Sequence, residues 1–151
     1  MILFQLHKNG IWWEFWPGFF GVLALWWELS GAGEIAALAM LAAVLLHESG
    51  HLFFFWRTGI PVERVVFDFR GVTIRPAQGI YPHRKLLLTS AGGCIFSIIG
   101  VIAGWVLAIN CGVSDIWWQA SAAAAVYSLL PLPGTDGAEC FRCLGGVSPR
   151  T

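Results

Sequence analysis

Two stretches of this sequence are long and apolar enough to cross a lipid bilayer as helices. They cover residues 33 to 57 and 84 to 109, and each exceeds the roughly 20 residues that a transmembrane helix needs. The chain is 57% hydrophobic and only 12% charged, which is far more apolar than a water-soluble domain of 151 residues requires. Both observations indicate an integral membrane protein.

Two further apolar stretches, residues 15 to 29 and 116 to 130, are shorter than a standard span. The first is either a crossing or a re-entrant or surface-lying helix, and the second is expected to continue in irregular form past Pro131. All nine Lys and Arg residues lie near the N-terminus, between residues 57 and 85, or in the C-terminal tail. The positive-inside rule places these segments in the cytoplasm. We therefore expect an all-α multi-pass protein of the cell membrane, with about four transmembrane helices and both termini cytoplasmic.

The connection between the two long apolar stretches has the alternation of a β-strand pair. In residues 60 to 76, apolar and polar side chains alternate on both sides of Gly71. This pattern predicts a short membrane-associated hairpin. An exposed edge of the strands at 62–75 could accept an unwound substrate segment by β-addition.

The remaining composition argues against other classes of protein. The net charge is zero, so no basic excess points to nucleic acid. The four cysteines do not have the spacing of a disulfide framework. We find no internal repeat and no linker, so we expect one domain over residues 1–151.

An H-E-x-x-H motif lies inside the first long apolar stretch, formed by His47, Glu48 and His51. Ionisable side chains in hydrocarbon are costly, by roughly 3 kcal/mol each on insertion scales, so three within five residues suggest a function. On a helix, positions i and i+4 share a face, and both imidazoles can reach one metal ion. Glu48 could then hold a water molecule without ligating the metal. Without a metal, the histidines would pair with backbone and the glutamate would be protonated.

Catalytic zinc usually has three protein ligands, so two histidines leave one position to fill. Asp136 is placed in "LLPLPGTDGAE", where prolines and glycines break the fourth apolar stretch. Irregular backbone at membrane depth normally lines a cavity, which would bring this carboxylate to the metal. Asp136 could instead cap a short helix, with Glu139 completing a capping box. The other candidate ligands are His7, His83, Glu63, Glu139 and the cysteines, including the Cys140–Cys143 pair.

"HESGH" followed far downstream by "LLPLPGTDG" resembles the site-2 protease family of intramembrane zinc metalloproteases. The resemblance runs over residues 31–145 and is nearest to the compact bacterial branch that includes the sporulation proteases. "TSAGG" is similar to a small-residue segment of the family, with Gly93 in place of proline. Ser128 stands where the family has asparagine.

The resemblance implies one zinc ion per chain, bound by His47, His51 and Asp136, with Glu48 as the general base. It further implies hydrolysis of peptide bonds in transmembrane proteins or peptides within the bilayer. The expected unit is the catalytic core alone, without a PDZ or C-terminal regulatory domain. Its exposed small residues would also allow association with a second copy.

Two alternatives to a protease remain at this point. A metal transporter or sensor in the membrane would use the same ligands but needs further ones along a pathway through both leaflets. A scaffold without activity would have no need for Glu48 beside a complete ligand set.

Overall fold

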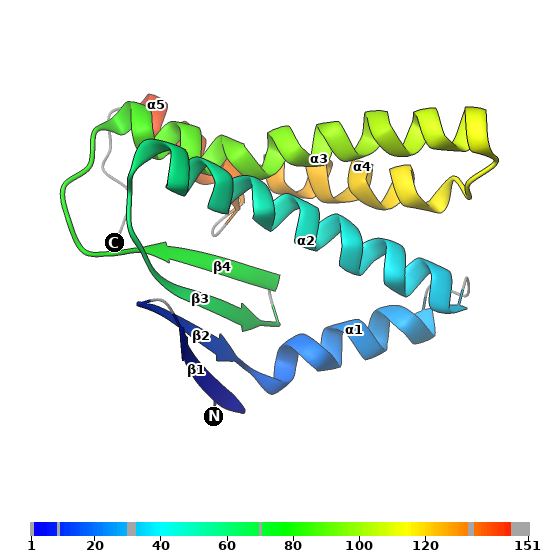
Figure 1. Cartoon of the computed structure of the whole chain (residues 1–151), viewed down its shortest axis with the longest axis horizontal. Helices are drawn as coiled ribbons and strands as arrows, with labels where there is room; N and C mark the ends of the chain where they lie inside the picture. The colour runs from blue at the N-terminus through cyan, green and yellow to red at the C-terminus, as the bar shows by residue number, and fades with distance from the viewer. Residues whose placement is uncertain (1, 9, 30–32, 70, 133–134, 146–151) are drawn as a thin grey trace.

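The computed structural model describes residues 2–8, 10–29, 33–69, 71–132 and 135–145, without the side chains of Leu23, Trp26, Trp27 and Leu29. Its elements run in the order β-hairpin, short helix, long helix, β-hairpin and three helices (Figure 1). Their bounds are β1 Phe4–Lys8, β2 Ile11–Phe15, α1 Pro17–Leu29, α2 Gly33–Thr58, β3 Val62–Asp68, β4 Gly71–Pro76, α3 His83–Cys111, α4 Ile116–Leu129 and α5 Asp136–Leu144.

Helices α2 and α3 are long and apolar enough to cross a membrane, over Glu34–Thr58 and His83–Cys111. The core helix of a soluble protein would pass the same test but would be mostly buried. Here only 28% and 33% of the most apolar part of each helix is buried. Large aliphatic side chains such as Ile98, Ile99 and Ile102 of α3 are about half exposed, which is the expected surface of a helix in lipid. The two helices therefore indicate membrane association.

The expectation of an all-α protein with about four transmembrane helices is wrong. The described chain combines a four-stranded sheet with five helices, and only α2 and α3 qualify as spans. The 13 residues of α1 rise by about 20 Å, short of the roughly 30 Å of a hydrocarbon core. The 14 residues of α4 end at Leu129, close to Pro131, which cannot continue a helix.

The sheet contains the expected hairpin and a second one that the sequence analysis did not predict. The strand order is β1-β2-β3-β4, with antiparallel outer pairs and a parallel β2–β3 pair. Gly10, in the turn between β1 and β2, has a positive φ of 78°, which glycine tolerates best. Stacked rings of Phe4, Phe15 and Phe67 link three neighbouring strands on one face.

The order of the strands shows which strands lie at the edges of the sheet. β3 lies between β2 and β4, so its backbone is paired on both sides. The open edges of the sheet are β1 and β4. Of the predicted strands at 62–75, only the second could therefore accept another chain.

Close backbone contact joins α2 to α3. A Cβ on Gly50 would overlap the carbonyl of Gly92, and a Cβ on Gly92 would lie 2.7 Å from the carbonyl oxygen of Gly50. The absence of side chains at both positions is what lets the helices approach this closely. α4 returns alongside α3, and α5 lies at the end of the molecule where α2 ends and α3 begins (Figure 1). This arrangement brings residues from three helices to one point.

Candidate metal centre

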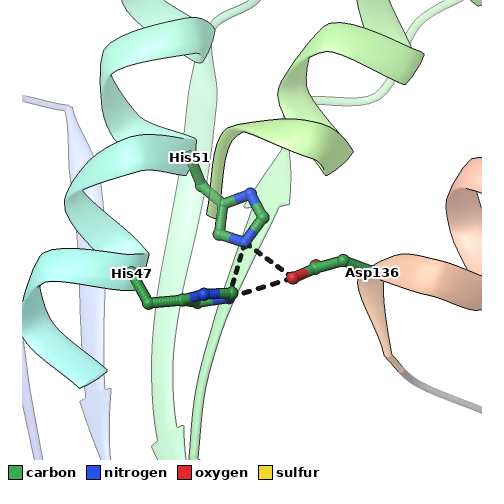
Figure 2. A group of neighbouring side chains, drawn as sticks. All are labelled: His47, His51 and Asp136. Atoms are coloured by element: carbon green, nitrogen blue, oxygen red, sulfur yellow. Dashed lines mark hydrogen bonds and ion pairs between the residues drawn. The ribbon is translucent and has the colours of Figure 1, made fainter. Parts of the chain in front are cut away.

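Helix α2 carries His47 and His51 one turn apart on its buried face. Their side chains face the same point, and Nε2 of one lies 3.2 Å from Nε2 of the other. The residues are 8% and 7% exposed, so both rings are withdrawn from solvent and lipid. Figure 2 shows the two rings converging on Asp136, which comes from α5. Oδ2 of Asp136 lies 2.9 Å from Nε2 of His47 and 3.2 Å from Nε2 of His51.

The start of α5 directs Asp136 toward the histidines instead of into a helix cap. The N-cap residue is Thr135, and Asp136 is the first residue of the helix. The hydroxyl of Thr135 donates to the carbonyls of Leu130 and Leu132, which fixes the break after α4. Glu139 accepts from Arg142 and does not form the capping box that was the alternative for this segment. Pro133 and Gly134 of the motif lie outside the described residues.

The surroundings of Asp136 keep it ionised. Burial alone would raise the pKa of this carboxyl, but the hydrogen bonds to His47 and His51 outweigh burial and lower the pKa to about 2. The first turn of a helix also favours a negative charge. Asp136 is therefore a carboxylate at any physiological pH, the form that binds cations.

The three side chains match the geometry that zinc requires. Tetrahedral zinc with bonds of about 2.0–2.1 Å to nitrogen and oxygen holds its ligand atoms roughly 3.3–3.4 Å apart. The three edges of this triangle measure 2.9, 3.2 and 3.2 Å. Among the described residues, this is the group of His, Cys, Asp and Glu side chains close enough to hold a metal ion.

Gly93 of α3 leaves room beside the same two nitrogens. A Cβ at this position would overlap Nε2 of both His47 and His51. The missing side chain thus lets both rings lie against the backbone of α3. The residues present fit a metal ion at this point.

The far nitrogens of both rings are held by α3. Nδ1 of His51 lies 2.7 Å from the carbonyl oxygen of Thr89, and Nδ1 of His47 lies 2.9 Å from Oγ of Ser97. Such hydrogen bonds orient metal-binding histidines in general. Ser97 was not singled out by the sequence analysis.

Glu48 follows His47 directly and is half-buried. Its carboxyl is close enough to be influenced by the charges of His51 and Asp136. Within the described chain it forms no hydrogen bond or ion pair, so it is available to a water molecule or substrate. It lies next to the triangle without being part of it.

The other predicted ligand candidates lie elsewhere. His7 is exposed on β1 and stacks on Trp12, and His83 is exposed at the start of α3. Glu63 is exposed on β3. Glu139 is paired with Arg142 at 2.6 Å. None of the four joins the triangle in the described structure.

The cysteines of α5 do not form a metal site either. Burial raises the pKa of Cys140 to about 11 and also raises that of Cys143. Without a metal ion, both thiols are therefore protonated at neutral pH. The Cys140–Cys143 pair is not part of the metal-binding group among the described residues.

Ser128, at the position where the resembling family has asparagine, does not face the triangle. Its hydroxyl donates to the carbonyl of Ala125 at 3.1 Å, so it accepts from the thiol of Cys94 at 3.2 Å. Ser128 is 5% exposed and ties α4 to α3. This residue therefore has a structural partner and no free donor for a substrate.

A search of solved structures finds "Site-2 Protease from Methanocaldococcus jannaschii" with a TM-score of 0.71. The match covers 95% of this chain and 71% of that chain at 20% sequence identity. The chain has the site-2 protease fold. No protein-family model and no curated protein matches the sequence.

The site-2 protease fold confirms the resemblance that was drawn from the two motifs. At this level of identity, the structural match establishes the fold alone. The chemistry of this chain rests on its own residues.

Proposed function

We propose that this protein is an intramembrane zinc metalloprotease that hydrolyses peptide bonds of transmembrane substrates. The observation that supports this most directly is the triangle of His47, His51 and Asp136 beside Glu48, in a chain with the site-2 protease fold. His47 and His51 would supply two neutral nitrogen ligands and Asp136 an oxygen, which leaves a fourth position open, as catalytic zinc sites do. We further propose that α2 and α3 cross the bilayer.

Each residue has a distinct role in the proposed reaction. When bound, zinc would lower the pKa of a coordinated water toward about 7 and polarise the scissile carbonyl. Glu48 takes a proton from the attacking water and passes it to the leaving amine. Asp136 brings a permanent negative charge from a separate helix. The absence of a side chain at Gly93 lets the two rings keep the positions in which their Nε2 atoms face Asp136.

A metal transporter or sensor is the alternative. Transport requires ligands along a pathway through both halves of the bilayer. Over the described residues, the triangle is the group close enough to hold a metal, and its two histidines lie in one half of α2. We therefore favour hydrolysis.

Zinc content and cleavage test this proposal together. We expect about one zinc per chain by elemental analysis of detergent-purified wild type and of the Cys140→Ala/Cys143→Ala double variant, and little in Asp136→Ala. Glu48→Gln should keep its zinc but cleave single-span transmembrane peptides in liposomes at least about 100-fold more slowly, because general acid–base catalysis contributes that much or more. Cleavage would be followed by mass spectrometry.

Two outcomes would contradict the proposal. Zinc that persists in Asp136→Ala and is lost with the cysteines would move the site to α5. Unchanged cleavage by Glu48→Gln would remove the proposed base.

A further inference from the structure

We infer that Ser97 of α3 is a positioning residue that holds His47 in the tautomer able to bind the metal. This inference rests on the proposed function, because it concerns one ligand of the proposed zinc site. Ser97 does not contact substrate or metal, and it acts only through the imidazole of His47.

A nitrogen that binds a metal ion must direct a free lone pair at it. Nε2 of each histidine faces Asp136 and the other ring, so Nε2 is the atom directed at the metal. A neutral imidazole has one protonated nitrogen and one with a free lone pair. Metal binding through Nε2 therefore requires the proton on Nδ1.

The backbone settles this choice for His51. Its Nδ1 lies 2.7 Å from the carbonyl oxygen of Thr89, and a carbonyl oxygen can only accept. His51 therefore carries a proton on Nδ1, and its Nε2 can bind the metal once the ion replaces any proton that Nε2 shares with Asp136. No side chain is needed to hold this tautomer.

His47 depends on a side chain for the same purpose. Its Nδ1 lies 2.9 Å from Oγ of Ser97, 50 residues away along the chain. A hydroxyl can donate or accept, and the metal-binding tautomer of His47 requires Ser97 to accept. Ser97 is 1% exposed, so in the described structure no solvent can replace it.

Ser97 differs from the other buried hydroxyl residues in the helices. Thr89, Ser121 and Ser128 each donate to a carbonyl of the preceding turn of their own helix. Such bonds satisfy a hydroxyl locally and tell nothing about function. Across the described residues, Ser97 is the buried helical hydroxyl whose partner is a side chain of the metal site.

The metal affinity of variants distinguishes a positioning role of Ser97 from a role in helix packing alone. Cobalt(II) serves as the probe, because its absorption bands report the geometry of its ligands and a competing chelator gives the dissociation constant. We compare the wild type with Ser97→Ala, Ser97→Thr and Ser121→Ala in detergent. Ser121→Ala is the matched control, since Ser121 is 5% exposed, lies in a neighbouring helix and bonds only to its own backbone in the described chain.

Loss of the partner of Nδ1 should weaken cobalt binding by roughly 10- to 100-fold in Ser97→Ala, as is typical for groups that orient ligands. Ser97→Thr keeps the hydroxyl and should restore most of the affinity. Ser121→Ala should bind cobalt like the wild type. Without metal, the melting temperatures of Ser97→Ala and Ser121→Ala should fall by similar amounts. In the zinc-loaded protein, the ¹⁵N chemical shifts of His47 should show the Nδ1–H tautomer in the wild type and a mixture in Ser97→Ala.

Wild-type affinity in Ser97→Ala, or equal weakening in Ser121→Ala, would overturn the role of Ser97 and leave the proposed zinc site standing. Absence of cobalt binding to the wild type would overturn both the role of Ser97 and the proposed zinc site. The two failures are therefore distinguishable from one set of titrations.

Discussion

The close approach of both histidine rings to α3 depends on the glycine at position 93. His47 and His51 can lie this close to α3 because the helix has no Cβ at this position. A sequence pattern of small residues predicts close helix packing, but it does not indicate that one glycine faces a ligand pair. Ser97 lies one turn further along the same helix and was also not predicted. Its role becomes visible only when α3 is placed against α2.

Gly93→Ala should therefore abolish zinc binding. The added methyl group would occupy the space beside both nitrogens and push the rings apart. The measurement is zinc per purified chain, expected to fall from about one to near zero. Gly104→Ala is the control, because it adds the same group to the same helix against Trp118, away from the histidines. Full zinc in Gly93→Ala would show that the metal lies elsewhere.

The thiol of Cys140 should be unreactive at neutral pH. With burial raising its pKa to about 11, the thiolate is a small fraction at pH 7 and grows about tenfold with each pH unit below that pKa. Maleimide labelling read by peptide mass spectrometry should therefore be slow at pH 7 and accelerate toward pH 9. The exposed Cys111 provides the comparison in the same sample. Equal labelling rates of Cys140 and Cys111 at pH 7 would contradict the raised pKa of Cys140 and restore the cysteines as candidate metal ligands.

At the scale of elements, the length of the apolar stretches predicted the two long helices correctly. It was misleading for the two short stretches, which were counted among about four transmembrane helices. The stretches at 33–57 and 84–109 correspond within two residues to α2 and α3. The apolar stretch at 15–29 is not one helix. Its first residue, Phe15, ends strand β2, and the helix that begins at Pro17 is too short to cross a bilayer. The signal for the missed hairpin is Asn9-Gly10 between apolar and aromatic residues, a strong turn sequence. The parallel pairing of β2 with β3 joins segments about 50 residues apart, which no local pattern reveals.

The contact between α2 and α3 makes Gly50 sensitive to any enlargement. A Cβ on Gly50 would meet backbone of Gly92, which cannot rotate away as a side chain can. Gly50→Ala should lower the free energy of unfolding by about 1–3 kcal/mol, the usual cost of overpacking. Thermal unfolding in detergent would measure this loss. Gly21→Ala in α1 is the control, because a Cβ there meets nothing within 4 Å and alanine favours a helix.

At the scale of the whole molecule, the basic residues around the ends of α2 and α3 predict an orientation. Arg57 ends α2, and Arg84 and Lys85 begin α3, at the end of the molecule where α5 also lies (Figure 1). The positive-inside rule would place this end in the cytoplasm. The metal triangle lies in the half of α2 nearer this end.

We therefore expect a reporter protein fused after Thr151 to lie in the cytoplasm. Green fluorescent protein should fluoresce in this fusion, and alkaline phosphatase should be inactive, because each matures on one side of the membrane. The protein should also stay in the membrane fraction after carbonate washing. Active phosphatase would reverse the orientation, and release by carbonate would exclude spanning helices.

The two helices that share the Gly50–Gly92 contact carry everything in the site except Asp136, which arrives on α5. A bound ion would therefore fasten a terminal element to the rest of the chain, joining residues that are 85 positions apart in sequence. Any ligand that binds only the folded form shifts the folding equilibrium, by about 2.7 kcal/mol when its free concentration is a hundred times its dissociation constant. A metal ion bound in this way would stabilise the fold in addition to its proposed part in the reaction, so removal of metal should lower the stability of the whole protein.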